Sequence, residues 1–163
     1  MSILAYGLLF VLSLLVQLKI VPLFSINETT PDLILIVVIA VAFRKGQLWG
    51  ALSGCVVGLF WDVLGTEFVG LSALCKAIAG YTAGFFAHEQ VERSFGTLVG
   101  LLIMTILIHD FVYYSIMSIG LSMNWWQMFF RYILFKTTYT FVIALAIHLA
   151  WPTGLWGHAR RFE

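Results

Sequence analysis

The stretch GQLWGALSGCVVGLFWD, residues 46–62, decides the fold. It carries no charge before its final aspartate, and glycine recurs every four residues at Gly46, Gly50, Gly54 and Gly58. Residues four apart lie on the same face of an α-helix, so the four glycines form one flat stripe on an apolar helix. In lipid, small residues at this spacing let two helices approach closely. The pattern predicts a membrane helix that is packed tightly against a neighbour.

The whole chain has the composition of a membrane protein. Of its 163 residues, 61% are hydrophobic and 10% are charged, and the mean hydropathy is +0.99. Soluble domains are about 45–50% apolar and about 25% charged. The net charge of +1 gives no basic field for binding nucleic acid. Cys55 and Cys75 lie within apolar runs without CxxC spacing, so we expect neither a disulfide framework nor a metal site from them.

Apolar runs in the rest of the chain predict five further helices. The six predicted spans are 3–21, 31–43, 47–64, 68–88, 95–120 and 127–151, in one domain covering residues 1–163. The first run lacks a basic start and a small-residue cleavage site, so we interpret it as a mature helix rather than a signal peptide. The second run is short for a bilayer core of about 30 Å, but we expect it to cross with the help of residues 21–26 or of snorkelling by Arg44 and Lys45. The predicted fold class is all-α, an integral membrane bundle of six transmembrane helices.

Lysine and arginine residues beside the predicted spans are divided unequally between the two sides of the membrane. One side receives five of them: Arg44, Lys45, Arg93, Arg160 and Arg161. The other side receives two, Lys19 and Arg131. Basic residues are enriched on the cytoplasmic side, so we expect both termini in the cytoplasm. Asp62 and Glu67 then lie at the outer surface.

Residues Thr29-Thr30-Pro31-Asp32 are typical of the start of a helix. A threonine can accept hydrogen bonds as the N-cap, proline suits the first helical position, and an early aspartate favours the positive end of the helix dipole. The alternative is a polar contact point for a partner.

The glycine stripe allows two interpretations. It fits close packing against another helix of this chain, and it also fits a groove for the membrane helix of a partner protein. Gly65 and Gly70 indicate a tight turn at the outer end of the glycine helix. Asp62, at the same end, can face water or contact a partner.

Charged residues inside apolar runs cost several kcal/mol each unless they are paired or hydrated. Counting about 1.5 Å per helical residue places Lys76, Asp110 and Lys136 at one level, about 3–4 Å outside the bilayer midplane. We predict that Asp110 pairs with Lys136, with Lys76 or with both. Lys76 can also snorkel toward Asp62 across the turn. His109 is more typical of hydrogen-bonded packing than of a proton relay.

The sequence contains no recognisable catalytic or metal-binding pattern. The GxSxG, HExxH and P-loop motifs are missing. His88, His148 and His158 are scattered and do not converge with a Cys or an Asp at metal-ligand spacing. We therefore expect neither an enzyme nor a cofactor or metal site.

A series of short motifs between residues 31 and 84 resembles the MreD family of rod shape-determining proteins. The motifs in this series are Pro31-Asp32-Leu33, Arg44-Lys45-Gly46, the glycine helix ending at Asp62, Gly65, Gly70-Leu71-Ser72-Ala73-Leu74 and Ala79-Gly80-Tyr81-Thr82-Ala83-Gly84. Chain length and the number of predicted spans agree with the family. The signature positions are Gly50, Gly54, Gly58 and Asp62, and Ser72 departs from the asparagine-like residue expected there.

The resemblance implies a non-catalytic scaffold in the inner membrane of a bacterium. Members of the family bind MreC, which has a single membrane helix and a periplasmic region. Through the complex they act with RodA, a class B penicillin-binding protein and the MreB filament to organise lateral peptidoglycan synthesis and rod cell shape. The fold of the family is similar to the S component of energy-coupling-factor vitamin transporters, so the resemblance also supplies a rival function.

The resemblance and the residues together suggest where MreC binds, and they leave alternatives open. Our hypothesis is that the outer turn from Asp62 to Gly70 and the glycine face of the third helix contact MreC. The rival is a small-molecule carrier or S component, with an outward cavity lined by Lys76, Asp110, Lys136, Trp61 and Tyr113. A further alternative is a proton-coupled transporter that uses His109 and Asp110.

Overall fold

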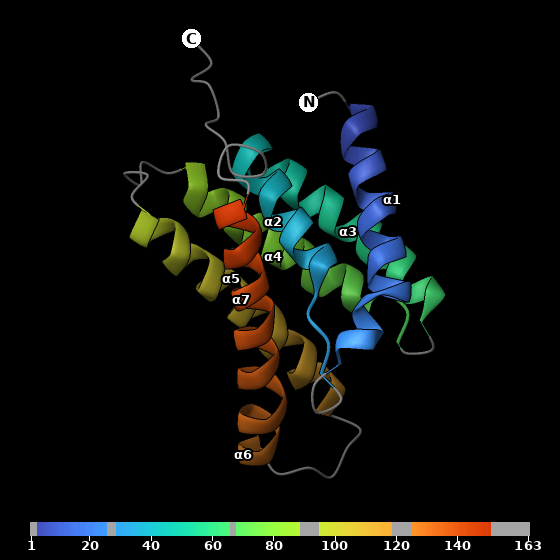
Figure 1. The fold of residues 1–163 in the computed structure, drawn as a ribbon, viewed down its shortest axis with the longest axis vertical. Coiled ribbons are helices and arrows are strands. Elements are labelled where there is room, and N and C mark those ends of the chain that lie inside the picture. The colour runs from blue at the N-terminus through green and yellow to red at the C-terminus, as the bar shows by residue number, and fades with distance from the viewer. Residues whose placement is uncertain (1–2, 26–28, 66–67, 89–94, 119–124, 151–163) are drawn as a thin grey trace.

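The computed structural model describes residues 3–25, 29–65, 68–88, 95–118 and 125–150, and all of the regular elements within these ranges are helical (Figure 1). In chain order the elements are α1 (Ile3–Lys19), the short 3-10 helix η1 (Val21–Phe24), α2 (Leu33–Lys45), α3 (Gln47–Leu64), α4 (Leu71–His88), α5 (Phe95–Met117), α6 (Trp125–Met128), the π-helical segment η3 (Phe129–Ile133) and α7 (Leu134–Ala150). The predicted all-α class is therefore confirmed for the part of the chain that the structure describes.

Three helical stretches are long and apolar enough to cross a membrane, namely Tyr6–Leu23, Gln47–Leu64 and Gly96–Met117. Two further apolar helices are shorter, Leu71–Ala87 and Leu134–Ile147. Length and composition therefore support a membrane protein, while the expected bundle of six spans remains a prediction.

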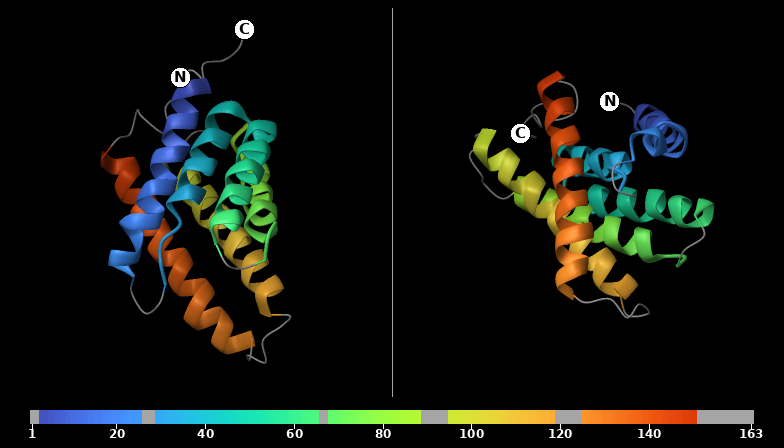
Figure 2. Two further views of the ribbon diagram at one scale, coloured as in Figure 1. Left: turned by 90° about the vertical axis from the view of Figure 1, so that its right-hand side faces the viewer. Right: turned by 60° about the horizontal axis from the view of Figure 1, so that its bottom comes forward.

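Helix α2 occupies the centre of the molecule. Nine consecutive residues, Ile34–Ala42, are buried, because α1, α3, α4, α5 and α7 all pack against this helix. Figure 2 shows the surrounding helices from two further sides. A helix that is covered all round needs no polar face, which explains the run LILIVVIAVA at residues 33–42.

The boundaries of α2 differ from those expected for the second span. The helix begins at Leu33 rather than at residue 31, because Asp32 is its N-cap and accepts a hydrogen bond from the Leu35 amide. It ends at Lys45, where Gly46 adopts a positive φ of 90° between α2 and α3. The aspartate, and not a threonine, caps the helix.

Helices α3 and α4 form an antiparallel pair, and they lie side by side in Figures 1 and 2. Gly50 lies against Gly80, Gly54 against Lys76 and Gly58 against Ala73. Figures 1 and 2 also show that α5 and α7 cross one another and that their ends near α6 extend beyond the other helices. Helix α1 packs on α2 at the edge of the molecule, where Leu8, Val11 and Leu12 are exposed.

Candidate functional site

The N-terminal end of α2 lies inside the molecule and is held by polar side chains from other helices. The Gln17 side chain of α1 donates from Nε2 to the carbonyl of Pro31 (2.9 Å) and accepts from the amide of Leu33 (2.8 Å). The Asp32 amide donates to Thr140 Oγ1 of α7 over 3.2 Å. Buried backbone groups need such partners, so these contacts make a non-helical entry into α2 possible within the protein.

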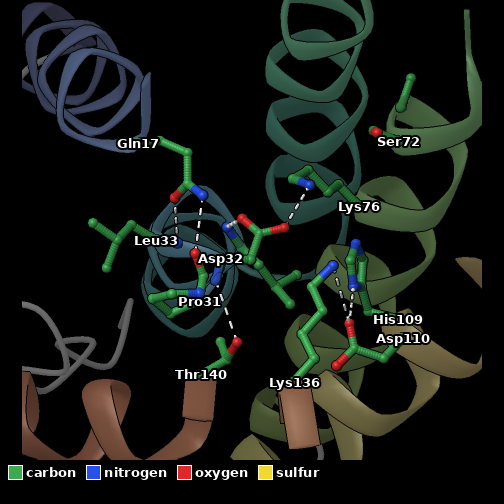
Figure 3. A network of polar contacts seen from close by, with 12 residues as sticks. Gln17, Pro31, Asp32, Leu33, Ser72, Lys76, His109, Asp110, Lys136 and Thr140 are labelled. Carbon is green, nitrogen blue, oxygen red and sulfur yellow. Dashed lines mark hydrogen bonds and ion pairs between the residues drawn. The ribbon is translucent and has the colours of Figure 1, made fainter. Parts of the chain in front are cut away.

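Asp32 also forms a buried ion pair with Lys76 of α4. Lys76 Nζ lies 2.7 Å from Asp32 Oδ2, and both side chains are buried (Figure 3). The other carboxylate oxygen of Asp32 accepts the cap hydrogen bond from Leu35. One carboxylate therefore both caps α2 and neutralises the ammonium group of α4.

A second charged group surrounds Asp110 of α5. Thr137 donates to Asp110 Oδ2 over 2.7 Å, and His109 Nδ1 lies 3.0 Å from Oδ1. Lys136 Nζ lies 3.9 Å from the same Oδ1, and its ammonium also lies 5.0 Å and 5.3 Å from the ring centroids of Tyr113 and Tyr114. Cation–π contacts of this kind add to the stabilisation of a partly desolvated lysine.

The structure thus brings Lys136 to Asp110, while Lys76 pairs with Asp32 instead. Lys76 also does not turn to Asp62, as snorkelling across the turn would require. The reason is that α2 begins deep in the protein, so its cap carboxylate lies beside α4. Figure 3 shows the Asp32–Lys76 pair and the His109–Asp110–Lys136 group in one region between α2, α4, α5 and α7.

Asp62 is buried, and its carboxylate is used within the chain. It accepts backbone hydrogen bonds from Gly70 (2.8 Å), Ser72 (3.2 Å) and Ala73 (3.2 Å). The first amides of a helix have no partner within the helix, so Asp62 of α3 caps α4. Gly70 has a φ of +98°, a conformation that favours glycine, and this explains why the turn needs a glycine. The interpretation of Asp62 as a residue that faces water is therefore wrong.

Replacing Asp62 by alanine is expected to lower the free energy of unfolding by about 1–3 kcal/mol, because buried amides at the start of α4 lose a charged acceptor. Thermal unfolding of the purified chain in detergent micelles measures the effect. Thr138→Ala serves as the control, because Thr138 is exposed and its hydroxyl donates to the Leu134 carbonyl of its own helix. Equal stability of the two variants would contradict the capping role.

The glycine face of α3 is filled by α4. A Cβ atom at Gly54 would clash with the carbonyl of Lys76 and lie 2.9 Å from the Ala77 nitrogen. One at Gly58 would lie 2.5 Å from the Ala73 Cα. Helix α4 of the same chain therefore covers the glycine stripe. The part of our hypothesis in which MreC binds this face is wrong for this fold. Gly65 lies at the C-terminal end of α3, where its amide donates to the Trp61 carbonyl.

Sequence reasoning missed several residues of the polar cluster. Asp32 was interpreted only as part of a helix start, and Gln17, Thr137 and Thr140 were not considered. A signal for Asp32 existed, because it is an acidic residue at the head of a run too short to span a bilayer. Glu67 and the side chain of Arg131 lie outside the residues that the structure describes.

Comparison with known proteins gives one positive result. A family model described as rod shape-determining protein MreD matches residues 1–155 of the 163-residue chain. No curated protein and no solved structure matches the chain. The expected likeness to the S component of vitamin transporters therefore remains an expectation.

Proposed function

The chain belongs to the MreD family of rod shape-determining proteins, and on this premise we propose that it is a non-catalytic membrane scaffold that binds MreC. Membership implies a role in determining rod shape, and the family is not known as a family of enzymes. In the proposed complex the chain acts with RodA, a class B penicillin-binding protein and MreB to organise lateral peptidoglycan synthesis. The proposed location is the inner membrane of a bacterium, with several crossings and with both termini in the cytoplasm.

The family match over residues 1–155 carries this proposal. The pairing of the buried charges supports it, because Lys76 and Lys136 both meet carboxylates of the chain itself. Buried ion pairs of this kind can fix the relative placement of helices, at a cost in stability. The rival function, a carrier of small molecules, gains no support from these lysines, since their counter-ions are internal.

We assign the contact with MreC to the turn between α3 and α4. Phe68 and Val69 are 69% and 72% exposed, and they directly precede Gly70, whose amide donates to the Asp62 carboxylate. Two exposed apolar side chains beside the capped start of a helix are suited to act as anchors in a partner's pocket. On the proposed orientation this turn lies at the outer surface, the side of the periplasmic region of MreC.

Replacing Phe68 and Val69 together by serine is expected to reduce co-purification of MreC at least about tenfold, which corresponds to about 1.4 kcal/mol. The measurement is affinity purification of the tagged chain from membranes that also contain MreC. The matched control is Leu8→Ser, because Leu8 is an apolar residue of similar exposure (73%) on α1, outside the turn between α3 and α4.

The two parts of the proposal fail in different ways. If the unaltered chain does not retain MreC, the proposed function is wrong. If both the unaltered chain and the double variant retain MreC equally, the function stands and the contact lies on another surface. A small molecule found by mass spectrometry in the purified chain, together with no retention of MreC, would favour the carrier.

A further inference from the structure

His109 is a buried histidine with one ring nitrogen in use. Its side chain is 1% exposed, Nδ1 lies 3.0 Å from Asp110 Oδ1, and Nε2 has no hydrogen-bond partner among the described residues. An ionised carboxylate only accepts hydrogen bonds, so Nδ1 carries the hydrogen and Nε2 keeps a lone pair. Figure 3 shows the Nε2 edge of the ring turned away from Asp110.

Charged groups face this region from every large helix that packs against α5. Helix α4 contributes Lys76, α2 contributes Asp32 and α7 contributes Lys136, while Asp110 belongs to α5 itself. The Tyr113 ring stacks on the imidazole, with 6.2 Å between centroids, and Tyr132 of η3 lies next to Tyr114. With a neutral imidazole, the two carboxylates and the two ammonium groups of this described cluster sum to zero charge.

Protonation would disturb this balance in two ways. The cluster would gain one positive charge inside the protein, where an uncompensated charge is costly. The new Nε2–H donor would also have no acceptor among the described residues. The Asp110 carboxylate already contacts His109, Lys136 and Thr137. Its negative charge is therefore not available to offset the added positive charge of an imidazolium.

We propose that His109 is a proton-binding site that controls how firmly α5 is held against α4. Nε2 takes a proton from hydronium, which leaves a water molecule, so the neutral imidazole becomes an imidazolium and the buried cluster becomes cationic. The close packing of α5 on α4 then loosens. The cluster is not sealed completely, because the Lys136 side chain is 15% exposed and Tyr113 and Tyr114 are half-buried.

A native thiol can report this loosening. Cys75 on α4 has no exposed surface, and it lies one helical turn before Ala79, which shares a buried core cluster with Leu102 and Ile106 of α5. Cys55 is exposed, so a Cys55→Ser background leaves Cys75 as the cysteine to be labelled. N-ethylmaleimide, a small and membrane-permeant reagent, reaches Cys75 when the packed surface of α4 opens.

The experiment compares the full chain with its His109→Asn variant in lipid nanodiscs at pH 7.5 and pH 5.5. Asparagine keeps a donor for Asp110 but cannot take up a proton. The rate of Cys75 labelling relative to the variant is expected to be near one at pH 7.5 and to rise severalfold at pH 5.5, because a histidine released from the packed cluster is neutral at the first pH and mostly protonated at the second. The ratio cancels the pH dependence of the thiol reaction itself. His88→Asn, about 18 Å along α4 from Lys76, is the control and should behave as the unaltered chain.

An equal ratio at both pH values would overturn the proposal, and so would a rise that His88→Asn abolishes. If His109→Asn fails to insert, His109→Gln replaces it in the same comparison. If neither variant inserts, nitrogen NMR of labelled histidines in the unaltered chain decides. Formation of the His109 imidazolium together with faster Cys75 labelling supports the switch, and a neutral ring down to pH 5.5 rejects it.

Discussion

Replacing Gly54 by alanine is expected to destabilise the chain by about 3 kcal/mol or more, at the upper end of the cost of overpacking a close-packed interior. The added methyl group would meet the carbonyl of Lys76, and the Ala77 nitrogen would lie 2.9 Å away. These are backbone atoms of α4, so no side-chain rotation can make room. The two helices must separate, and the loss of folded protein after extraction in detergent measures the effect.

The matched control is Gly100→Ala on α5, where a Cβ atom meets nothing within 4 Å. Alanine favours a helix over glycine by about 1 kcal/mol, so this variant should be as stable as the unaltered chain or slightly more stable. If Gly54→Ala and Gly100→Ala unfold at the same temperature, α3 and α4 are not packed as the structure has them.

The second large effect is expected from Asp32→Asn. Asparagine is as good an N-cap as aspartate, so the variant removes the charge and keeps the cap. Lys76 is then left as a buried cation without its partner, which costs about 3–5 kcal/mol. Urea or thermal unfolding in mixed micelles measures the loss.

The double variant Asp32→Asn with Lys76→Met should recover most of that loss, because an apolar side chain can take the place of the buried ammonium. Lys45→Met is the control for removing a lysine, since Lys45 is exposed at the end of α2 and surface substitutions change stability by less than about 0.5 kcal/mol. A double variant that is no more stable than Asp32→Asn alone would show that the ion pair does not couple the two sites.

The sequence predicts the helices well and their lateral arrangement poorly. The glycine helix is observed at Gln47–Leu64, the residues expected for that span, because apolar length and helical periodicity are local properties. The depth of a residue in the membrane can also be counted along a helix, and this is why the contact between Asp110 and Lys136 could be predicted. Rotation about the helix axis and the choice of neighbour depend on contacts between distant segments, so the partner of Lys76 could not be deduced.

Asp32 and Asp62 also show that the surroundings of a residue could not be predicted from the sequence. Each was placed near a helix end, where water is usually available, yet both are buried and hydrogen-bonded within the chain. Asp32 is internal because α2 has only 13 residues, about 20 Å of helix, and starts inside the protein. The glycine stripe likewise indicates a close approach without indicating which helix makes it.

The interior start of α2 has a consequence for biogenesis. Its entry is completed by Gln17, Lys76 and Thr140, and two of these belong to helices that the ribosome makes later. Until α4 and α7 have been synthesised, the carboxylate and the irregular backbone before Leu33 lack their final partners, and lipid cannot replace them. We therefore expect α2, although it is synthesised early, to reach its final position only after α4 and α7 have been made.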